Sequence, residues 1–372
     1  MLGDKSFPRY SYVLVALLAL VIVLATIFSA AQATILSVTL RSLFLLLMAC
    51  GLSILLPCTT ETLSRLCFCL GLAGTIASAV ALAGIVCLNL KLNLLAFAIT
   101  NPNYMYGLPE VQSFFGNPNG LGMFLVFSIA GTIVLFALLR SRKETNGLRV
   151  PSFYFILAIQ LVTLVLTFSR AALIALSLFV LCFIWHNNRR YCYTPLVLLS
   201  AAVLVSKQAF EKSSIVEIVR ALANGRVQLW AEGLQLFKQY PLFGTGLGGW
   251  FAITGNPLTL HNTYIHVAVE LGLVGLALYL IYSALFMQGL RETMKKAAEG
   301  SSRYILSSGL YSLCIGLLVH QFFESYLYHG LPLFLLVMIP LHTFMREPGT
   351  LYRFRETVWE QGEFPLFYRR VS

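Results

Sequence analysis

The chain has 372 residues, of which 58% are hydrophobic and 11% are charged, and its formal net charge is +11. Soluble domains carry roughly a quarter of charged residues, so this composition excludes a soluble enzyme and a disordered protein and predicts an integral membrane protein with many spans. Asp4 is the one aspartate in the sequence. Sites built on aspartate, such as Asp-x-Asp metal or nucleotide-sugar sites and Asp-containing triads, are therefore excluded.

A membrane-spanning helix needs about 20 apolar residues. We predict ten such spans, at residues 11–32, 34–57, 66–88, 119–139, 152–169, 171–185, 193–206, 263–287, 304–323 and 331–345. The sequence therefore predicts an all-α, polytopic membrane protein that forms a single integral membrane domain over residues 1–372. Spans one to seven lie in 1–206, a long helical outer loop follows at 207–262, spans eight to ten lie in 263–345, and a tail covers 346–372.

Lysine and arginine in the loops predict the orientation of these spans. If the N-terminus is cytoplasmic, most of the 26 basic residues fall on the cytoplasmic side, and every cytoplasmic segment carries at least one. We therefore expect both termini in the cytoplasm and the 207–262 loop on the outer face. The positive charge is then mainly an orientation signal, and we expect the lipid bilayer, not a nucleic acid, as the partner.

The first outer loop, residues 89–118, contains the Asn-Pro pairs of Asn101-Pro102 and Asn117-Pro118. Such pairs are turn signals, which favours a plain loop that enters the fourth span. The alternative is a polar edge that faces a substrate.

Arg170 is the basic residue that most needs an explanation, because it lies in the very short connection between the fifth and sixth spans. An arginine at that depth is costly unless it faces a cavity or a partner. The lysines of the longer outer loops need less explanation, since long loops cross the membrane regardless of their charge.

The long outer loop is predicted to contain two amphipathic helices and a glycine-rich turn. Ser214 with Glu217 indicates a capping box at the start of the first helix. The second helix is predicted from Arg226 to the Tyr240-Pro241 pair, which ends it. Its expected apolar stripe consists of Val227, Trp230, Leu234 and Phe237. The glycine-rich stretch 243–250 lets backbone approach a ligand closely, but it lacks the Gly-Lys-Ser/Thr of a nucleotide-binding loop.

His261 stands where the long outer loop enters the eighth span, beside Asn262, a good N-cap residue, and Thr263, the expected first residue of the helix. The helix dipole disfavours the imidazolium form there, which keeps the ring neutral and able to accept a proton. The alternative is a polar loop histidine without a chemical role. His261 and His266 are five residues apart, which does not place two metal ligands on one helix face, and we expect no metal and no cofactor.

Glu270 shares a face of the eighth span with His266 and lies about 12 Å below the start of that helix. A carboxylate at that depth is expected to be paired, with Arg41 and Arg170 as candidate partners. A structural ion pair is favoured over a direct catalytic role. Glu324 and His320, at the end of the ninth span, are four residues apart and are candidates to line the same cavity.

Together these residues place arginines, one base and aromatic rings at the outer face. Arginines bind phosphate groups in a bidentate fashion, so the arrangement suits a membrane-buried diphosphate lipid. The chemistry it favours is transfer from a diphosphate leaving group without a metal, with arginines offsetting the charge that develops. The residues expected to contribute are Arg170, Arg220, Arg226, Trp230, Trp250, His261 and Tyr264.

At these positions the sequence resembles the O-antigen ligase/polymerase family of bacteria. The motifs that carry the resemblance are Ser169-Arg170-Ala171, Gly225-Arg226-x-x-x-Trp230, Pro241-Leu-Phe-Gly-x-Gly246 with Gly248 and Trp250, and His261-Asn262-x-Tyr264 followed by Glu270-Leu-Gly-Leu-Val-Gly275. The chain departs from the family by its shortness, with fewer spans than ligases often have.

The resemblance implies a metal-independent, inverting glycosyltransferase of the bacterial inner membrane that faces the periplasm and uses an undecaprenyl-diphosphate-linked glycan. It implies catalytic roles for His261, which would activate the acceptor hydroxyl, and for Arg170 and Arg226, which would bind the diphosphate. Substrate-binding residues are then expected to be Arg220, Trp230, Trp250, Asn262, Tyr264 and Glu270.

The favoured function is an O-antigen ligase that acts on lipid A–core in lipopolysaccharide biosynthesis. One alternative is an O-antigen or exopolysaccharide polymerase, whose acceptor is another lipid-linked glycan. An alternative of another class is a transporter for an anion such as bicarbonate or for a lipid-linked glycan. A transporter needs charges along a path through the midplane, whereas the unusual charges here cluster in the outer third of the spans.

Overall fold

The computed structural model describes residues 7–29, 31–55, 58–105, 107–142, 149–187, 226–325, 327–328 and 331–345. Several predicted features lie outside the described residues: the seventh span at 193–206, the helix predicted from Ser214, Arg220, and the tail at 346–372.

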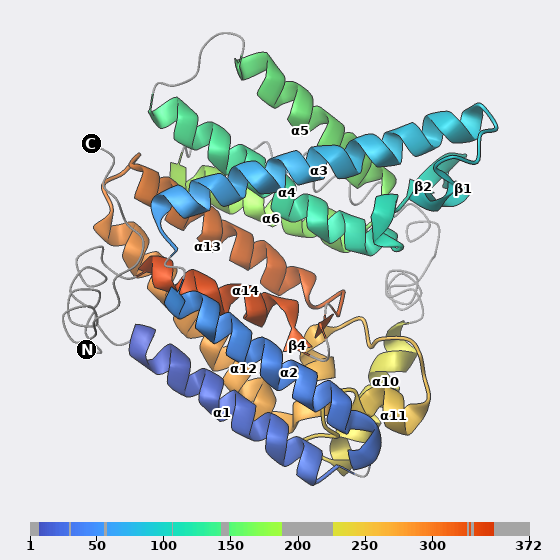
Figure 1. The fold of residues 1–372 in the computed structure, drawn as a ribbon, viewed down its shortest axis with the longest axis vertical. Coiled ribbons are helices and arrows are strands. Elements are labelled where there is room, and N and C mark those ends of the chain that lie inside the picture. Colours follow the sequence, from blue (N-terminus) through green and yellow to red (C-terminus); the bar gives the residue numbers. More distant parts are fainter. Residues whose placement is uncertain are drawn as a thin grey trace, which may run out of the picture.

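The fold is all-α and polytopic, as predicted (Figure 1). Each predicted span within the described residues corresponds to a helix: α1 (Phe7–Ile27), α2 (Gln32–Leu55), α3 (Thr60–Asn89), α4 (Pro118–Ser141), α5 (Arg149–Leu166), α6 (Arg170–Asn187), α12 (Thr263–Lys296), α13 (Ser302–His320) and α14 (Leu333–Leu341). Among the described residues, 6 helices are long and apolar enough to cross a membrane, namely α2, α3, α4, α6, α12 and α13. Shorter apolar stretches cover Tyr12–Ile27 in α1 and Val150–Leu166 in α5.

The last predicted span, 331–345, has a more irregular structure than expected. It begins with the two-residue strand β4 (Leu331–Pro332), which pairs with β3 (Leu327–Tyr328). It then forms α14, which contains Pro340, and ends in the 3₁₀ helix η4 (His342–Met345). Proline lacks the backbone N–H that a continuing α-helix needs, which fits the change of helix type directly after it.

Large apolar side chains cover the outer surface of the helices. Leu47 on α2 is 69% exposed and Phe155 on α5 is 68% exposed. Helices satisfy their own backbone hydrogen bonds, so they can present such surfaces to lipid. The exposed apolar faces and the buried polar groups described next are the arrangement expected of a membrane protein.

Small residues on α3 let α4 approach it closely. A Cβ atom on Gly74 would lie 1.8 Å from the Ser128 hydroxyl oxygen of α4. The buried Gln160 of α5 donates from Nε2 to the Gly71 carbonyl at 2.9 Å and to the Thr75 hydroxyl at 3.1 Å. Small residues and side-chain amides are the usual means of helix association in membranes, and here they hold α3, α4 and α5 together.

The segments predicted on the outer side gather at one end of the helices, where Figure 1 shows the β1–β2 hairpin near one edge and α10 (Arg226–Gln239) and α11 (Gly249–Thr254) near the other. The hairpin of β1 (Ile99–Met105) and β2 (Leu108–Val111) was not predicted. The 3₁₀ helices η1 (Ala96–Ala98) and η2 (Ser113–Phe115) flank it. The second Asn-Pro pair starts α4, where the Asn117 side chain accepts from the Asn119 backbone N–H.

Candidate functional site

The glycine-rich loop is inserted into a break in α12. Gly272 has φ 66° and ψ −169°, which interrupts the helix. The Thr245 N–H donates to the Val269 carbonyl at 2.9 Å, and the Leu273 N–H donates to the Pro241 carbonyl at 2.8 Å. A Cβ atom on Gly272 would lie 2.2 Å from the Leu242 carbonyl oxygen. Irregular backbone is tolerated at membrane depth where protein buries it, and the loop supplies the partners that the broken helix lacks.

The buried Glu270 of α12 binds the backbone of this loop. It is 2% exposed, and its Oε1 accepts from the Gly248 N–H at 2.8 Å. The same oxygen lies 3.3 Å from Nε2 of His266, the residue with which the sequence placed it on one helix face. Its partners are therefore Gly248 and His266, in place of the expected Arg41 or Arg170. Glu270 does not line the cavity described below.

The two loop tryptophans hold the segment that leads to His261. The Trp230 indole N–H donates to the Leu260 carbonyl and the Trp250 indole N–H donates to the Leu258 carbonyl, each at 2.8 Å. Trp250 is buried in a small apolar cluster with Leu236 and Leu260. The sequence suggested that both rings contact substrate, whereas their polar groups in this structure bind the protein's own backbone.

The helix predicted from Arg226 is α10, but its buried face differs from the predicted stripe. Val227 and Leu234 are 44% and 45% exposed, whereas Gly233 and Leu236 are buried. A Cβ atom on Gly233 would lie 2.9 Å from the Leu260 side chain. The close approach of α10 to Leu260 therefore depends on a glycine, which a search for apolar residues does not find.

Asn262 caps α12, as predicted. Its side-chain oxygen accepts from the Ile265 N–H at 3.0 Å, and its own N–H donates to the Ser325 hydroxyl at 2.8 Å. Tyr264, the second residue of the helix, donates from its hydroxyl to the Leu318 carbonyl at 2.7 Å. His261, directly before the cap, has φ 47°, a left-handed conformation that the contacts around it must hold in place.

Glu324 joins the two residues that the sequence singled out most strongly. One of its carboxylate oxygens lies 2.5 Å from Nη2 of Arg226, and the other lies 2.9 Å from Nδ1 of His261. Arg226 also donates to the Phe323 carbonyl. Glu324 is 5% exposed, and from its sequence position it was expected only as a candidate to line the same cavity.

The protonation of this cluster follows from its contacts. Burial alone would raise the pKa of Glu324, but the hydrogen bond from His261 and the charge of Arg226 outweigh it and lower that pKa. An ionised carboxylate only accepts hydrogen bonds, so Nδ1 of His261 carries the proton in this contact. In the neutral ring, Nε2 is then the basic nitrogen. The helix dipole was expected to favour the neutral ring of His261. The adjacent carboxylate of Glu324 stabilises the imidazolium once it forms.

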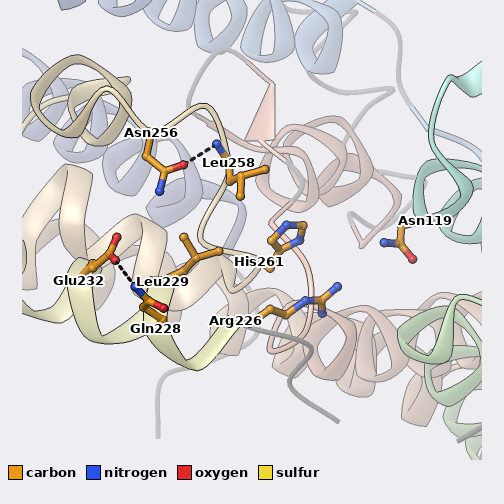
Figure 2. Close-up of a pocket in the computed structure, with 8 residues that line it drawn as sticks. All are labelled: Asn119, Arg226, Gln228, Leu229, Glu232, Asn256, Leu258 and His261. Carbon is orange, nitrogen blue, oxygen red and sulfur yellow. Dashed lines mark hydrogen bonds between the residues drawn. The ribbon is translucent and has the colours of Figure 1, made fainter. Parts of the chain in front are cut away.

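A cavity of about 480 Å³ opens beside this cluster (Figure 2). His261, Arg226 and Asn119 lie toward one side of the view, and Gln228 and Glu232 lie along α10. The lining residues are Asn119, Arg226, Gln228, Leu229, Glu232, Asn256, Leu258 and His261. A concave site with a few convergent polar groups is the usual form of a ligand-binding site.

Arg170 lies beside this cavity, not in its lining. It begins α6, and it is close enough to Arg226 and Tyr104 to interact with them electrostatically. The Tyr104 ring is 5.2 Å from the ring of Phe168, so the β1–β2 hairpin lies against the α5–α6 junction. None of the ion pairs between described residues involves Arg170. Within the same residues, no three His, Cys, Asp or Glu side chains are grouped as a metal ion would require.

The family comparison covers the segment that builds most of this site. Residues 153–280 match a family model described as O-antigen ligase. The resemblance predicted from the motifs is thereby confirmed, and the family implies a membrane glycosyltransferase of the ligase or polymerase type. No curated protein matches the chain.

The O-antigen ligase match runs from α5 into α12, so it contains Arg170, Arg226 and His261. Glu324 lies outside the matched residues. The structure nevertheless brings it to the centre of the site, because α13 returns beside α12 and the Thr263 N–H donates to the Gln321 carbonyl at 2.9 Å.

Proposed function

We propose that this protein is an O-antigen ligase that moves a glycan from undecaprenyl diphosphate to a hydroxyl of lipid A–core at the periplasmic face of the bacterial inner membrane. The observation that carries the proposal is the His261–Glu324–Arg226 cluster at the mouth of a cavity. It combines a base, the carboxylate that orients that base, and a guanidinium group in one place. The family match supports the type of reaction, and the predicted topology supports the periplasmic orientation.

In the proposed reaction, Nε2 of His261 takes the proton of the acceptor hydroxyl as that oxygen attacks the anomeric carbon of the donor sugar. A new glycosidic bond forms, and the bond from the anomeric carbon to the diphosphate oxygen breaks. The electron pair leaves with the diphosphate, and the proton stays on His261. A single displacement of this kind inverts the anomeric configuration.

Charge stabilisation is assigned to two arginines. Arg170 has no carboxylate partner among the described residues and offers its full charge to the departing diphosphate. Arg226 has five N–H groups, of which two are engaged with Phe323 and Glu324. Arg226 also lines the cavity. Preorganised cations at a leaving group are a major source of rate acceleration, and here they take the role that a metal has in other transferases.

The test uses the purified full-length protein with undecaprenyl-diphosphate-linked glycan as donor, in the presence of EDTA. Lipid A–core and a second lipid-linked glycan are supplied as acceptors in separate reactions. We expect product with lipid A–core, and its loss in His261→Ala and Arg170→Ala. His186→Ala, at the opposite end of α6 from Arg170, is the matched control and should stay active. Full activity of His261→Ala would refute the mechanism, and product only with lipid-linked glycan would identify a polymerase.

A further inference from the structure

The wall of the cavity opposite Asn119 in Figure 2 carries polar groups that the proposed reaction does not use. Gln228 and Glu232 come from successive turns of α10, and Asn256 comes from the loop after α11. We infer that this wall binds a sugar ring of the glycan, and that the diphosphate binds elsewhere. The inference rests on the proposed function and assigns a substrate class to part of its site.

The charges of the cavity argue against a phosphate group at this wall. Among the described residues that line the cavity, Arg226 is the one arginine or lysine, and Glu324 already pairs with it at 2.5 Å. Glu232 adds a negative charge to the lining itself. A diphosphate next to a carboxylate is repelled, and the effect is strong where the effective dielectric constant is low. Arg170, which has no ion-pair partner within the described part of the chain and is close enough to Arg226 to interact with it, is the better location for the diphosphate.

The hydrogen-bonding groups of the wall match sugar hydroxyls, each of which both donates and accepts. Glu232 is an acceptor with two oxygens, one of which receives a bond from the Gln228 amide at 3.3 Å. The side-chain oxygen of Asn256 accepts from the Leu258 N–H at 3.0 Å, so its NH₂ group is what it offers to a ligand. The wall thus presents both acceptor and donor groups without net positive charge.

Two leucines of the lining match the apolar faces of a sugar ring. Leu229 and Leu258 also line the cavity, and Leu258 is 55% exposed. A sugar ring has polar edges and apolar C–H faces, so it fits a wall that combines amides, a carboxylate and aliphatic side chains.

The wall also lies at a suitable distance from His261 for a bound sugar ring to reach it. Glu232 follows Arg226 by six residues on one helix, which corresponds to about 9 Å along its axis. A sugar ring held by Glu232 and Asn256 therefore has room to extend toward Nε2 of His261. Both the acceptor and the donor contain such rings, and the experiment below distinguishes the two sources.

The experiment measures binding to the full-length protein in lipid nanodiscs, without turnover. The four probes are delipidated core oligosaccharide, glycan released from the donor, undecaprenyl diphosphate without glycan, and inorganic diphosphate. The variants are Glu232→Gln and the double variant Gln228→Ala with Asn256→Ala. Glu292→Gln, an exposed carboxylate near the far end of α12, is the control, and the melting temperature of each variant confirms that it folds.

We expect the wall variants to weaken binding of one oligosaccharide by about tenfold or more, since one lost charged hydrogen bond has that effect. The oligosaccharide affected identifies the source of the ring. Binding of undecaprenyl diphosphate and inorganic diphosphate should stay within about twofold or become tighter in Glu232→Gln, which removes a repulsive charge. Unchanged binding of both oligosaccharides, or weaker binding of the diphosphates alone, would overturn the inference.

The same preparations separate this inference from the proposed function. If His261→Ala abolishes transfer while the wall variants bind both oligosaccharides normally, only the sugar-binding wall is refuted. If His261→Ala transfers glycan at the wild-type rate, the proposed mechanism is refuted whatever the binding data show.

Discussion

At the scale of single residues, the carboxylate of Glu324 sets the positions of two other side chains. Glu324 contacts His261 with one oxygen and Arg226 with the other, so a change there affects the base and the cation together. We predict that Glu324→Gln lowers kcat by about 100-fold, because a correctly oriented general base contributes about that much. The KM for the donor should change less. Steady-state kinetics with Glu292→Gln as control measure both, and an unchanged kcat would show that His261 does not need this partner.

The lowered pKa of Glu324 leads to a prediction about stability. Its pKa in the folded protein lies below the ordinary value of 4.5, so the ionised side chain stabilises the fold above that pH. The stabilisation is lost as the pH falls through the folded value. We expect the melting temperature of the wild type to fall more steeply below about pH 4.5 than that of Glu324→Gln. Parallel slopes in a thermal-shift titration would contradict the ion pair.

Residue types, spacing and motifs singled out His261, Arg226 and the cap Asn262, but not how they are connected. His261, Arg226 and Asn262 were found because each has a local sequence signal. Glu324 was expected only as a candidate to line the same cavity, because its partners His261 and Arg226 lie 63 and 98 residues away and no local pattern encodes those contacts. Trp230 and Trp250 were expected to bind substrate because they are aromatic residues of the family-like motifs at the outer face, but in the structure their indole N–H groups donate to the Leu260 and Leu258 carbonyls.

At the scale of elements, the break in α12 depends on one glycine. Gly272 has a positive φ and no room for a Cβ atom. We predict that Gly272→Ala destabilises the protein by about 3 kcal/mol, the upper end of ordinary single substitutions, and releases the loop. Gly51→Ala on α2 is the control, since its Cβ would meet nothing within 4 Å. Equal melting temperatures for the two variants would show that the break tolerates a side chain.

A second prediction at this scale concerns the segment before His261. Trp230→Phe keeps an aromatic ring but removes the N–H that binds the Leu260 carbonyl. We expect stability to fall by only about 1 kcal/mol, while kcat falls more than KM changes, because the base loses its fixed position. Trp185→Phe, near the C-terminal end of α6, serves as control. A change confined to KM would instead indicate that the Trp230 ring contacts substrate.

Helix boundaries were predicted better than interruptions. Asparagine caps mark where α4 and α12 begin, and these signals are local. The interruption of α12 was missed, because a glycine in a long apolar run does not reveal that a loop some thirty residues earlier fills the gap. The β1–β2 hairpin was missed because its Asn-Pro pair was interpreted as a turn, whereas it lies within β1.

At the scale of the whole molecule, the topology remains the prediction with the widest consequences. In a cysteine-free background, Lys212→Cys should react with a membrane-impermeant maleimide in intact spheroplasts. Glu299→Cys, exposed between α12 and α13, should react only after permeabilisation. The reverse pattern would place the cavity in the cytoplasm and refute the proposed function. The composition predicted the membrane-embedded, all-α class, because 58% of the residues are hydrophobic and only 11% are charged.

The interrupted α12 also has a consequence for the order in which the protein is assembled. Its outer part, from Thr263 to the break at Gly272, is about 15 Å long, half of the roughly 30 Å hydrocarbon core. The loop that completes it is synthesised earlier, and the Ser29 hydroxyl near the end of α1 donates to the Thr245 carbonyl of that loop at 2.5 Å. We therefore expect the loop to bind first to α1 and then to α12. Glu324 is synthesised after α12 and α13. We therefore expect these helices and the loop to associate during synthesis before the site is complete.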